Sequence, residues 1–392
     1  MFVIHTRFGL RSSITTLRTN QEVKQCHIVI INDMGLYKVH PVSNFLYEKK
    51  GSKYNTLKTK GQIVARFLNW FVENHFTFRE LEARLSTLCF NKVEYYINWL
   101  VSEGKSKSTI LNNQLTLKEF MGFLIRNGII NNKETIQEYN ERLSNKSSSF
   151  FQLYRRPNPR QTELVHELNL NYIISFIRLA IKHTTPIALG VYLQFFGGLR
   201  RGDCVNLTRS SVKSKGSYGE FGLELDIRER NLRTDLKDFD GTDGVKKPRI
   251  QVVFANRLLP LIYEQHSKTY DDITGQGALF VDKNCFPMSG RTYQQQFNRL
   301  KKIFIEKLLQ SDNLEASSYG LYLSNRKWST HIGRGTFSNW IAESTGNPLD
   351  VAIARGDSDI KSSLSYMEQS ETFLNGVNEV LNKMYENAWE YE

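Results

Sequence analysis

The chain of 392 residues is longer than one compact core usually accommodates, so two or three domains are expected. Its apolar fraction of 40%, with 24 Phe and 18 Tyr, excludes wholesale disorder. The formal net charge of +12 suits a polyanionic partner because neutralised phosphates release counterions, but it fits a merely basic protein equally well.

Cysteine usage and the absence of long apolar runs argue against several classes of protein. The four cysteines lie far apart and form no CxxC pair, which argues against a zinc ribbon or a disulfide framework and favours a reducing cytosol. The N-terminus lacks the apolar core of a signal peptide, and no segment approaches the ~18 apolar residues of a membrane span. We therefore expect a cytoplasmic protein, without a membrane anchor, that uses no metal.

Residues 1–50 form an N-terminal segment to which the sequence assigns no role. Within it, CHIVIIND (26–33) is a β-branched run followed by MGLYK, which predicts a strand and a turn. Residues 51–145 predict an all-helical domain, with apolar positions at helical spacing in 58–75, 91–104 and 106–128.

The third helix of this domain carries end signals of its own. Ser108 or Thr109 is expected to cap its start, and Gly128 to end it. A linker rich in Ser, Pro and basic residues is expected over 146–162. Candidate contacts to a phosphate backbone in the helical domain and the linker are Lys58, Lys60, Lys105, Lys107, Arg155, Arg156 and Arg160.

Residues 163–366 mix helical and strand patterns, so the chain as a whole is expected to be mainly α with a small β-sheet (α+β). Two helices open this region, and GLELDIR (222–228) and PRIQVVF (248–254) predict the strands of a hairpin. Residues 367–392 carry an apolar stripe at spacings of three and four, which predicts a C-terminal helix.

Three short segments stand out for their chemistry: GGLRRGDCVNL (197–207), WSTHIGRGTF (328–337) and GDSDIKSSLSY (356–366). Together they resemble the signature boxes of the tyrosine recombinase (phage integrase) family. Asp357 lies 23 residues after Arg334, and Tyr366 lies nine after Asp357; both gaps are typical of that family. The resemblance covers roughly residues 50 to 370 and implies a helical, SAM-like core-binding domain before a catalytic domain.

The resemblance implies a catalytic set of Arg200, His331, Arg334 and Tyr366. Independently of it, a tyrosine phenol can attack a phosphodiester and hold the strand covalently, so that rejoining requires no ATP, metal or other cofactor. Two arginines can clamp a phosphate in a bidentate way. His331 and Arg334 are three residues apart and would share one helix face.

Three further positions carry open alternatives. The resemblance implies a catalytic lysine in the expected hairpin; Lys246 is preferred, with Lys247 as a close alternative and Lys237 as a weaker third. Asp357 occupies the slot that holds a histidine in the resembled family: it could be protonated, could orient Arg200 or Arg334, or could leave the role to another donor such as Lys361 or His331. Asp203, in the first box, is expected to orient a cationic group of the site.

The predicted function is a site-specific DNA recombinase that forms a 3′-phosphotyrosine intermediate. The resemblance implies double-stranded DNA as partner, a tetramer of two dimers on paired sites, and accessory factors that bend DNA or set directionality, in a prokaryotic or phage-like, nucleoid-associated setting. A catalytically weakened relative that only binds DNA, and a type IB topoisomerase or telomere resolvase, remain alternatives. Each residue also has a purely structural interpretation, such as a satisfied core histidine for His331.

Overall fold

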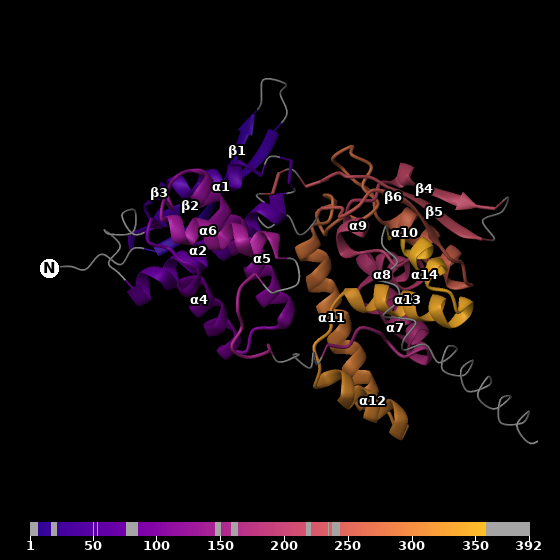
Figure 1. The fold of residues 1–392 in the computed structure, drawn as a ribbon. Helices are drawn as coiled ribbons and strands as arrows, with labels where there is room; N and C mark the ends of the chain where they lie inside the picture. The colour runs from indigo at the N-terminus through magenta and orange to yellow at the C-terminus, as the bar shows by residue number, and fades with distance from the viewer. Residues whose placement is uncertain are drawn as a thin grey trace, which may run out of the picture. The chain divides into compact units, whose positions relative to one another are not determined.

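The computed structural model describes residues 7–16, 22–49, 51–52, 54–75, 85–145, 150–157, 164–216, 221–233, 235–236 and 244–357. The chain divides into two compact units, Met1–Thr162 and Glu163–Glu392 (Figure 1). Each unit has its own core, and each is described here by itself. The nucleophile candidate Tyr366 and the tail 367–392 lie outside the described residues, as do Lys237, Lys361 and Arg160.

The first unit begins with a three-stranded antiparallel sheet of order β1-β2-β3. Its strands are β1 (Arg7–Thr16), β2 (Glu22–Ile31) and β3 (Tyr37–Val39). The strand and turn predicted from CHIVIIND and MGLYK are confirmed, because β2 pairs with β3 across a turn in which the Asn32 side chain accepts a hydrogen bond from Leu36 N at 2.9 Å. Strand β1 was not predicted, since Gly9 and a polar run interrupt its apolar alternation.

Helices complete the first unit: η1 (Pro41–Ser43), α1 (Asn44–Tyr47), α2 (Tyr54–His75), α4 (Phe90–Ser102), α5 (Lys107–Arg126) and α6 (Lys133–Ser144). The three predicted helices are confirmed as α2, α4 and α5. The predicted cap of α5 is wrong: the N-cap is Ser106, whose side chain accepts from Thr109 N. Gly128 follows the helix with φ +66°, a conformation that glycine adopts without strain.

One hydrophobic core joins the sheet to these helices. Phe8, Ile28 and Phe45 are buried in the same cluster as Phe67 and Phe120. The expected boundary at residue 50 therefore does not separate two cores, because the face of the sheet and the apolar stripes of the helices cover each other. Part of the expected linker also belongs to this unit: Phe151 is fully buried in its core.

The second unit contains α7 (Leu170–His183), α8 (Thr185–Gly197), α9 (Arg201–Val205), η3 (Arg209–Ser211), β4 (Val212–Lys215), β5 (Gly222–Ile227), β6 (Arg249–Val253), α10 (Leu258–Thr269), α11 (Gly290–Leu309), α12 (Leu314–Ser324), α13 (His331–Thr345) and α14 (Pro348–Arg355). The predicted hairpin is confirmed as β5 and β6, which pair antiparallel with Leu225 opposite Gln251. The expected α+β class is likewise confirmed.

Helix α8 lies at the centre of this unit (Figure 1). Ten of its 13 residues are buried, and it packs against α7, α10 and α13. A helix that is apolar on all sides is stable only when other elements surround it. Its C-terminal end, where the first signature segment begins, is therefore held in a fixed place. Among the described residues, no helix is both long and apolar enough to cross a bilayer.

Candidate active site

The first signature segment follows a tight turn at the end of α8. Gly198 has φ +64°, and a Cβ at this position would lie 2.5 Å from the Phe337 ring, so only glycine fits here. The turn leads through the buried Leu199 to Arg200, which directly precedes α9. The position of Arg200 is thus set by the packing of α8 against α13.

The second signature segment forms the first turn of α13. His331 is the first residue of this helix, and Arg334 lies one turn further along. Gly335 allows the helix to approach the preceding chain closely, because a Cβ there would lie 1.8 Å from the carbonyl oxygen of His166. Helix α13 is also tied to that segment by a hydrogen bond of 2.8 Å from Leu168 N to the Thr336 hydroxyl. These contacts hold the start of α13 against the segment that precedes α7.

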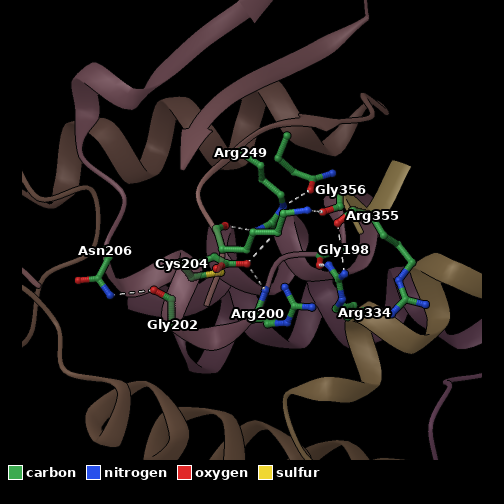
Figure 2. Close-up of polar contacts among 12 residues, drawn as sticks. Gly198, Arg200, Gly202, Cys204, Asn206, Arg249, Arg334, Arg355 and Gly356 are labelled. Carbon is green, nitrogen blue, oxygen red and sulfur yellow. Dashed lines mark hydrogen bonds and ion pairs between the residues drawn. The ribbon is translucent and has the colours of Figure 1, made fainter. Parts of the chain in front are cut away.

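Arg334 is a buried arginine with three acceptors. Its side chain is only 5% exposed. Nη1 donates to the carbonyl oxygen of Gly198 at 2.5 Å, and Nη2 donates to that of Arg355 at 3.2 Å and to Asp357 Oδ1 at 2.8 Å. These bonds join the ends of α8 and α14 to α13 (Figure 2). Arg334 therefore holds together the three signature segments.

The Asp357 carboxylate lies among three guanidinium groups. Oδ1 is 2.8 Å from Arg334 Nη2 and 3.7 Å from Arg200 Nη2, and Oδ2 is 2.9 Å from Arg355 Nε. Asp357 follows Gly356, whose φ of +63° turns the chain back at the end of α14. Of the alternatives that the sequence left open, this geometry matches the one in which Asp357 orients Arg200 or Arg334.

A second layer of polar contacts lies behind Arg200. Asp203 is fully buried, and its Oδ2 accepts from Arg200 N at 3.0 Å and from Arg249 Nη2 at 2.8 Å. Arg249 lies on β6, and its side chain packs where a Cβ on Gly356 would be. Arg249 also lies close enough to Arg200 and Arg334 for its charge to help lower the pKa of both groups, after burial (Figure 2). The hairpin is thereby coupled to the first and third signature segments.

Two of the candidate lysines, Lys246 and Lys247, lie just before β6, and both are exposed. Lys247 Nζ donates to the carbonyl oxygen of Gly356 at 3.3 Å. The charge of Lys246 is close enough to His331 to contribute to lowering the pKa of that imidazole. Lys247 therefore supports the backbone beside Asp357, whereas the charge of Lys246 acts on His331.

Burial and mutual repulsion lower the pKa values of the cationic groups in this site. Burial, together with the charges of Arg200 and Arg355, lowers the pKa of Arg334 to about 9. Burial also lowers the pKa of Arg200. His331 remains more than a third exposed, but partial loss of solvent around its ring, with Arg200 as the next cause, lowers its pKa. The site is thus positively charged and partly desolvated, which favours an anion, and His331 is neutral at pH 7.

An open cavity of about 490 Å³ adjoins these groups. Arg200, His331, Arg334 and Arg355 line it, together with His166, Lys327 and other residues from 164–166 and 327–335. A second cavity of about 840 Å³, lined by residues of α7, α12 and α13 and the segment preceding α7, contains Glu167 and Glu343 and none of these cations. Only the smaller of these two cavities suits a phosphate group.

The structure brings together Arg200, Asp203, His331, Arg334 and Asp357, with Lys246 at the edge of the group. Sequence reasoning missed two residues of this site, Arg249 and Arg355. A weak signal existed for each: Arg249 is the first basic residue after the lysine pair, and Arg355 directly precedes the third signature segment. An arginine at a helix end usually serves only the helix dipole, so Arg355 did not stand out.

The candidate DNA-binding residues of the first unit differ in their surroundings. Lys105 and Lys107 are exposed at the start of α5, and Arg155 and Arg156 are exposed in the segment after Phe151. Lys58 is half-buried on α2. Lys60 Nζ lies 2.5 Å from Glu119 Oε2, so its charge is already compensated within the unit.

Comparison with solved structures shows which proteins share this fold. The sequence matches no protein-family model and no curated protein. The Tn1549 transposon integrase, in complex with circular intermediate DNA, is 16% identical over 83% of this chain and 93% of that chain, at a TM-score of 0.55. XerH site-specific recombinase, bound to a palindromic difH substrate in a post-cleavage complex, is 12% identical over 87% and 84%, at a TM-score of 0.56. The expected resemblance is confirmed for the fold: the chain folds as these tyrosine recombinases do.

Proposed function

We propose that this chain, which has the fold of tyrosine recombinases, is a site-specific DNA recombinase that cleaves and rejoins DNA through a 3′-phosphotyrosine. One observation carries the proposal: Arg200, His331 and Arg334, from two distant segments, line one cationic cavity, and Asp357 is the counter-ion of the two arginines. A phosphodiester has the size and charge that such a cavity accepts.

The nucleophile in this proposal is Tyr366. Its phenolic oxygen forms a bond to phosphorus while the bond from phosphorus to the 5′ oxygen breaks. The phenol proton passes to a base, for which the neutral His331 is suited, and Lys246 donates a proton to the leaving 5′ oxygen. Rejoining reverses each step, with the 5′ hydroxyl as nucleophile, so the phosphoester energy is conserved.

The arginines stabilise the charge that develops on the non-bridging oxygens. Arg200 and Arg334 can act without reorganisation, because Asp203 holds the backbone of Arg200 and Asp357 holds the guanidinium of Arg334. Asp357 itself is acceptor-only when ionised and would repel a phosphate, so its role here is positioning. Asp203 orients Arg249 in the same way.

Double-stranded DNA is the proposed partner. Lys105, Lys107, Arg155 and Arg156 supply exposed positive charge for phosphate contacts outside the catalytic cavity. We further propose a tetramer of two dimers on paired sites, in which the tail 367–392 couples neighbouring protomers, and accessory factors that set the direction of exchange. The proposed location is the cytoplasm, in association with the nucleoid.

Covalent trapping tests this function. A pool of nicked duplexes with a randomised central sequence is incubated with the full chain, and complexes that survive denaturing detergent are sequenced. We expect a single enriched site, with the DNA attached to the peptide that contains Tyr366. Enrichment of a bound sequence without any covalent complex would instead identify a DNA-binding protein, and relaxation of plasmids without site preference would identify a topoisomerase.

A further inference from the structure

Arg355 occupies an unusual place for an arginine at a helix end. It is the last residue of α14, yet its side chain is only 9% exposed. Its carbonyl oxygen accepts a hydrogen bond from Arg334, and Asp357 N donates to Ala352 O at 3.0 Å, which turns the Asp357 carboxylate back towards Arg355. A side chain that served only the helix dipole would extend into solvent. The fold instead holds Arg355 against the candidate active site.

Among the described residues around Asp357, the arginines outnumber the carboxylates, which are Asp203 and Asp357. One carboxylate lies between the guanidinium groups of Arg200, Arg334 and Arg355, and all three arginines line the same cavity. The local surplus of positive charge is part of what lowers the pKa of Arg334. Maintaining this surplus in a desolvated site is costly unless an anion enters it. A phosphodiester supplies one negative charge, and its pentacoordinate transition state supplies a second.

We propose that Arg355 is a third arginine that binds the non-bridging oxygens of the scissile phosphate, and that Asp357 positions it for this contact. The inference rests on the proposed function and adds a catalytic residue to it. It also gives Asp357 a role. A carboxylate cannot donate a hydrogen bond to a phosphate, but Asp357 Oδ2 pairs with Arg355 Nε at 2.9 Å and can orient that guanidinium towards the phosphate. Arg355 then supplies the donor.

The test uses the duplex selected by covalent trapping and the full-length chain. Arg355→Gln removes the guanidinium, and Arg355→Lys keeps the positive charge but cannot form a bidentate contact. Arg233→Gln is the matched control, because Arg233 is also largely buried and also lies between two carboxylates, Asp235 and Asp282, but it does not line the cavity. We expect Arg355→Gln to slow covalent complex formation by about 10- to 100-fold, as for loss of a charge-assisted hydrogen bond, and Arg233→Gln to leave it unchanged.

A second measurement separates a phosphate contact from a structural role. Binding is measured in a Tyr366→Phe background to duplexes with either the natural scissile phosphate or an uncharged methylphosphonate in its place. If Arg355 contacts this phosphate, the methylphosphonate weakens binding of the Arg355→Gln protein much less than binding of the protein with Arg355. The Arg233→Gln protein should respond to the methylphosphonate as the parent does.

The proposal is overturned if the methylphosphonate weakens DNA binding equally in the proteins with and without Arg355. An unchanged cleavage rate in Arg355→Gln would overturn it as well. If Arg355→Gln does not fold, as judged by circular dichroism, the same comparison is made with Arg355→Lys, where the loss of the bidentate contact should again reduce the methylphosphonate effect. Failure of the unaltered chain to form any covalent complex is a different result, which overturns the proposed function itself.

Discussion

The buried pair of Asp203 and Arg249 offers a quantitative test of how the site is held. The Asp203 side chain is fully buried, and that of Arg249 is 6% exposed. Asp203→Asn keeps the size of the side chain but removes its charge, leaving the Arg249 guanidinium buried without a counter-ion at 2.8 Å. Breaking such a pair by changing one partner costs about 3–5 kcal/mol, and we expect about 3 because Asn Oδ1 can still accept a hydrogen bond.

Urea denaturation of the full chain measures this loss, and hydrogen exchange of peptides that cover 198–206 locates it. Arg249→Met should cost a similar amount, because it leaves Asp203 buried and unpaired. In the double variant neither charge remains, so we expect it to lose clearly less stability than the two single losses added together. Strictly additive losses would show that the two groups are not coupled, and unchanged exchange in 198–206 would show that the pair does not hold Arg200.

The same substitution should slow catalysis. Asp203 Oδ2 also accepts from Arg200 N at 3.0 Å, so weakening it loosens the backbone from which the Arg200 guanidinium projects. A displacement of about 1 Å at a catalytic group can cost about 100-fold in rate, and we expect Asp203→Asn to reduce covalent complex formation by about 10- to 100-fold. Binding of the uncleaved site should change by less than this factor, since the surface lysines and arginines are untouched.

Four further predictions follow from the proposed function and the structure. Tyr366→Phe should abolish covalent complexes while site binding persists, and any adduct on the Phe variant would contradict the assignment. DNA affinity should fall with a log–log salt slope of about −5 if about five or six phosphates are neutralised, and replacing Lys105 and Lys107 by Gln should make the slope shallower by about 2. Cleavage should survive excess EDTA, whereas loss on chelation and recovery with magnesium would indicate a nuclease. Burial lowers the pKa of His266 to about 4, and its Nε2 donates to Leu279 O at 2.8 Å. Because this folded pKa lies below the unfolded value of about 6.5, the free energy of unfolding should fall by about 3 kcal/mol as pH drops from 6.5 to 4. His266→Gln should remove this part of the loss.

Sequence patterns predicted the elements with the strongest periodicity. Helices α2, α4 and α5 carry long apolar stripes, and the strands β5 and β6 carry β-branched and alternating residues, so local pattern was sufficient for them. Strand β1 and the true cap of α5 were not predicted. Both depend on context: β1 is stabilised by pairing with β2, and Ser106 becomes a cap only where the chain turns into the helix.

The order and spacing of five residues predicted a class of chemistry, and the structure brings four of them together: Arg200, His331, Arg334 and Asp357. The fifth, Tyr366, lies outside the described residues, so its role stays a prediction. The spacing could not reveal what lies next to each group in space. Arg249 and Arg355 belong to the site only because β6 and the end of α14 pack beside the turn at Gly198.

The role of Asp357 illustrates the same division. From the sequence, an aspartate at this position was a departure with several open explanations, since two of its partners, Arg200 and Arg334, lie far from it along the chain. The tertiary structure surrounds it with three guanidinium groups, so that its carboxylate can pair with these cations and orient them. Local sequence thus determined which reactive groups this protein carries, and long-range packing decided which charges face one another, because electrostatic interactions act through space and not along the chain.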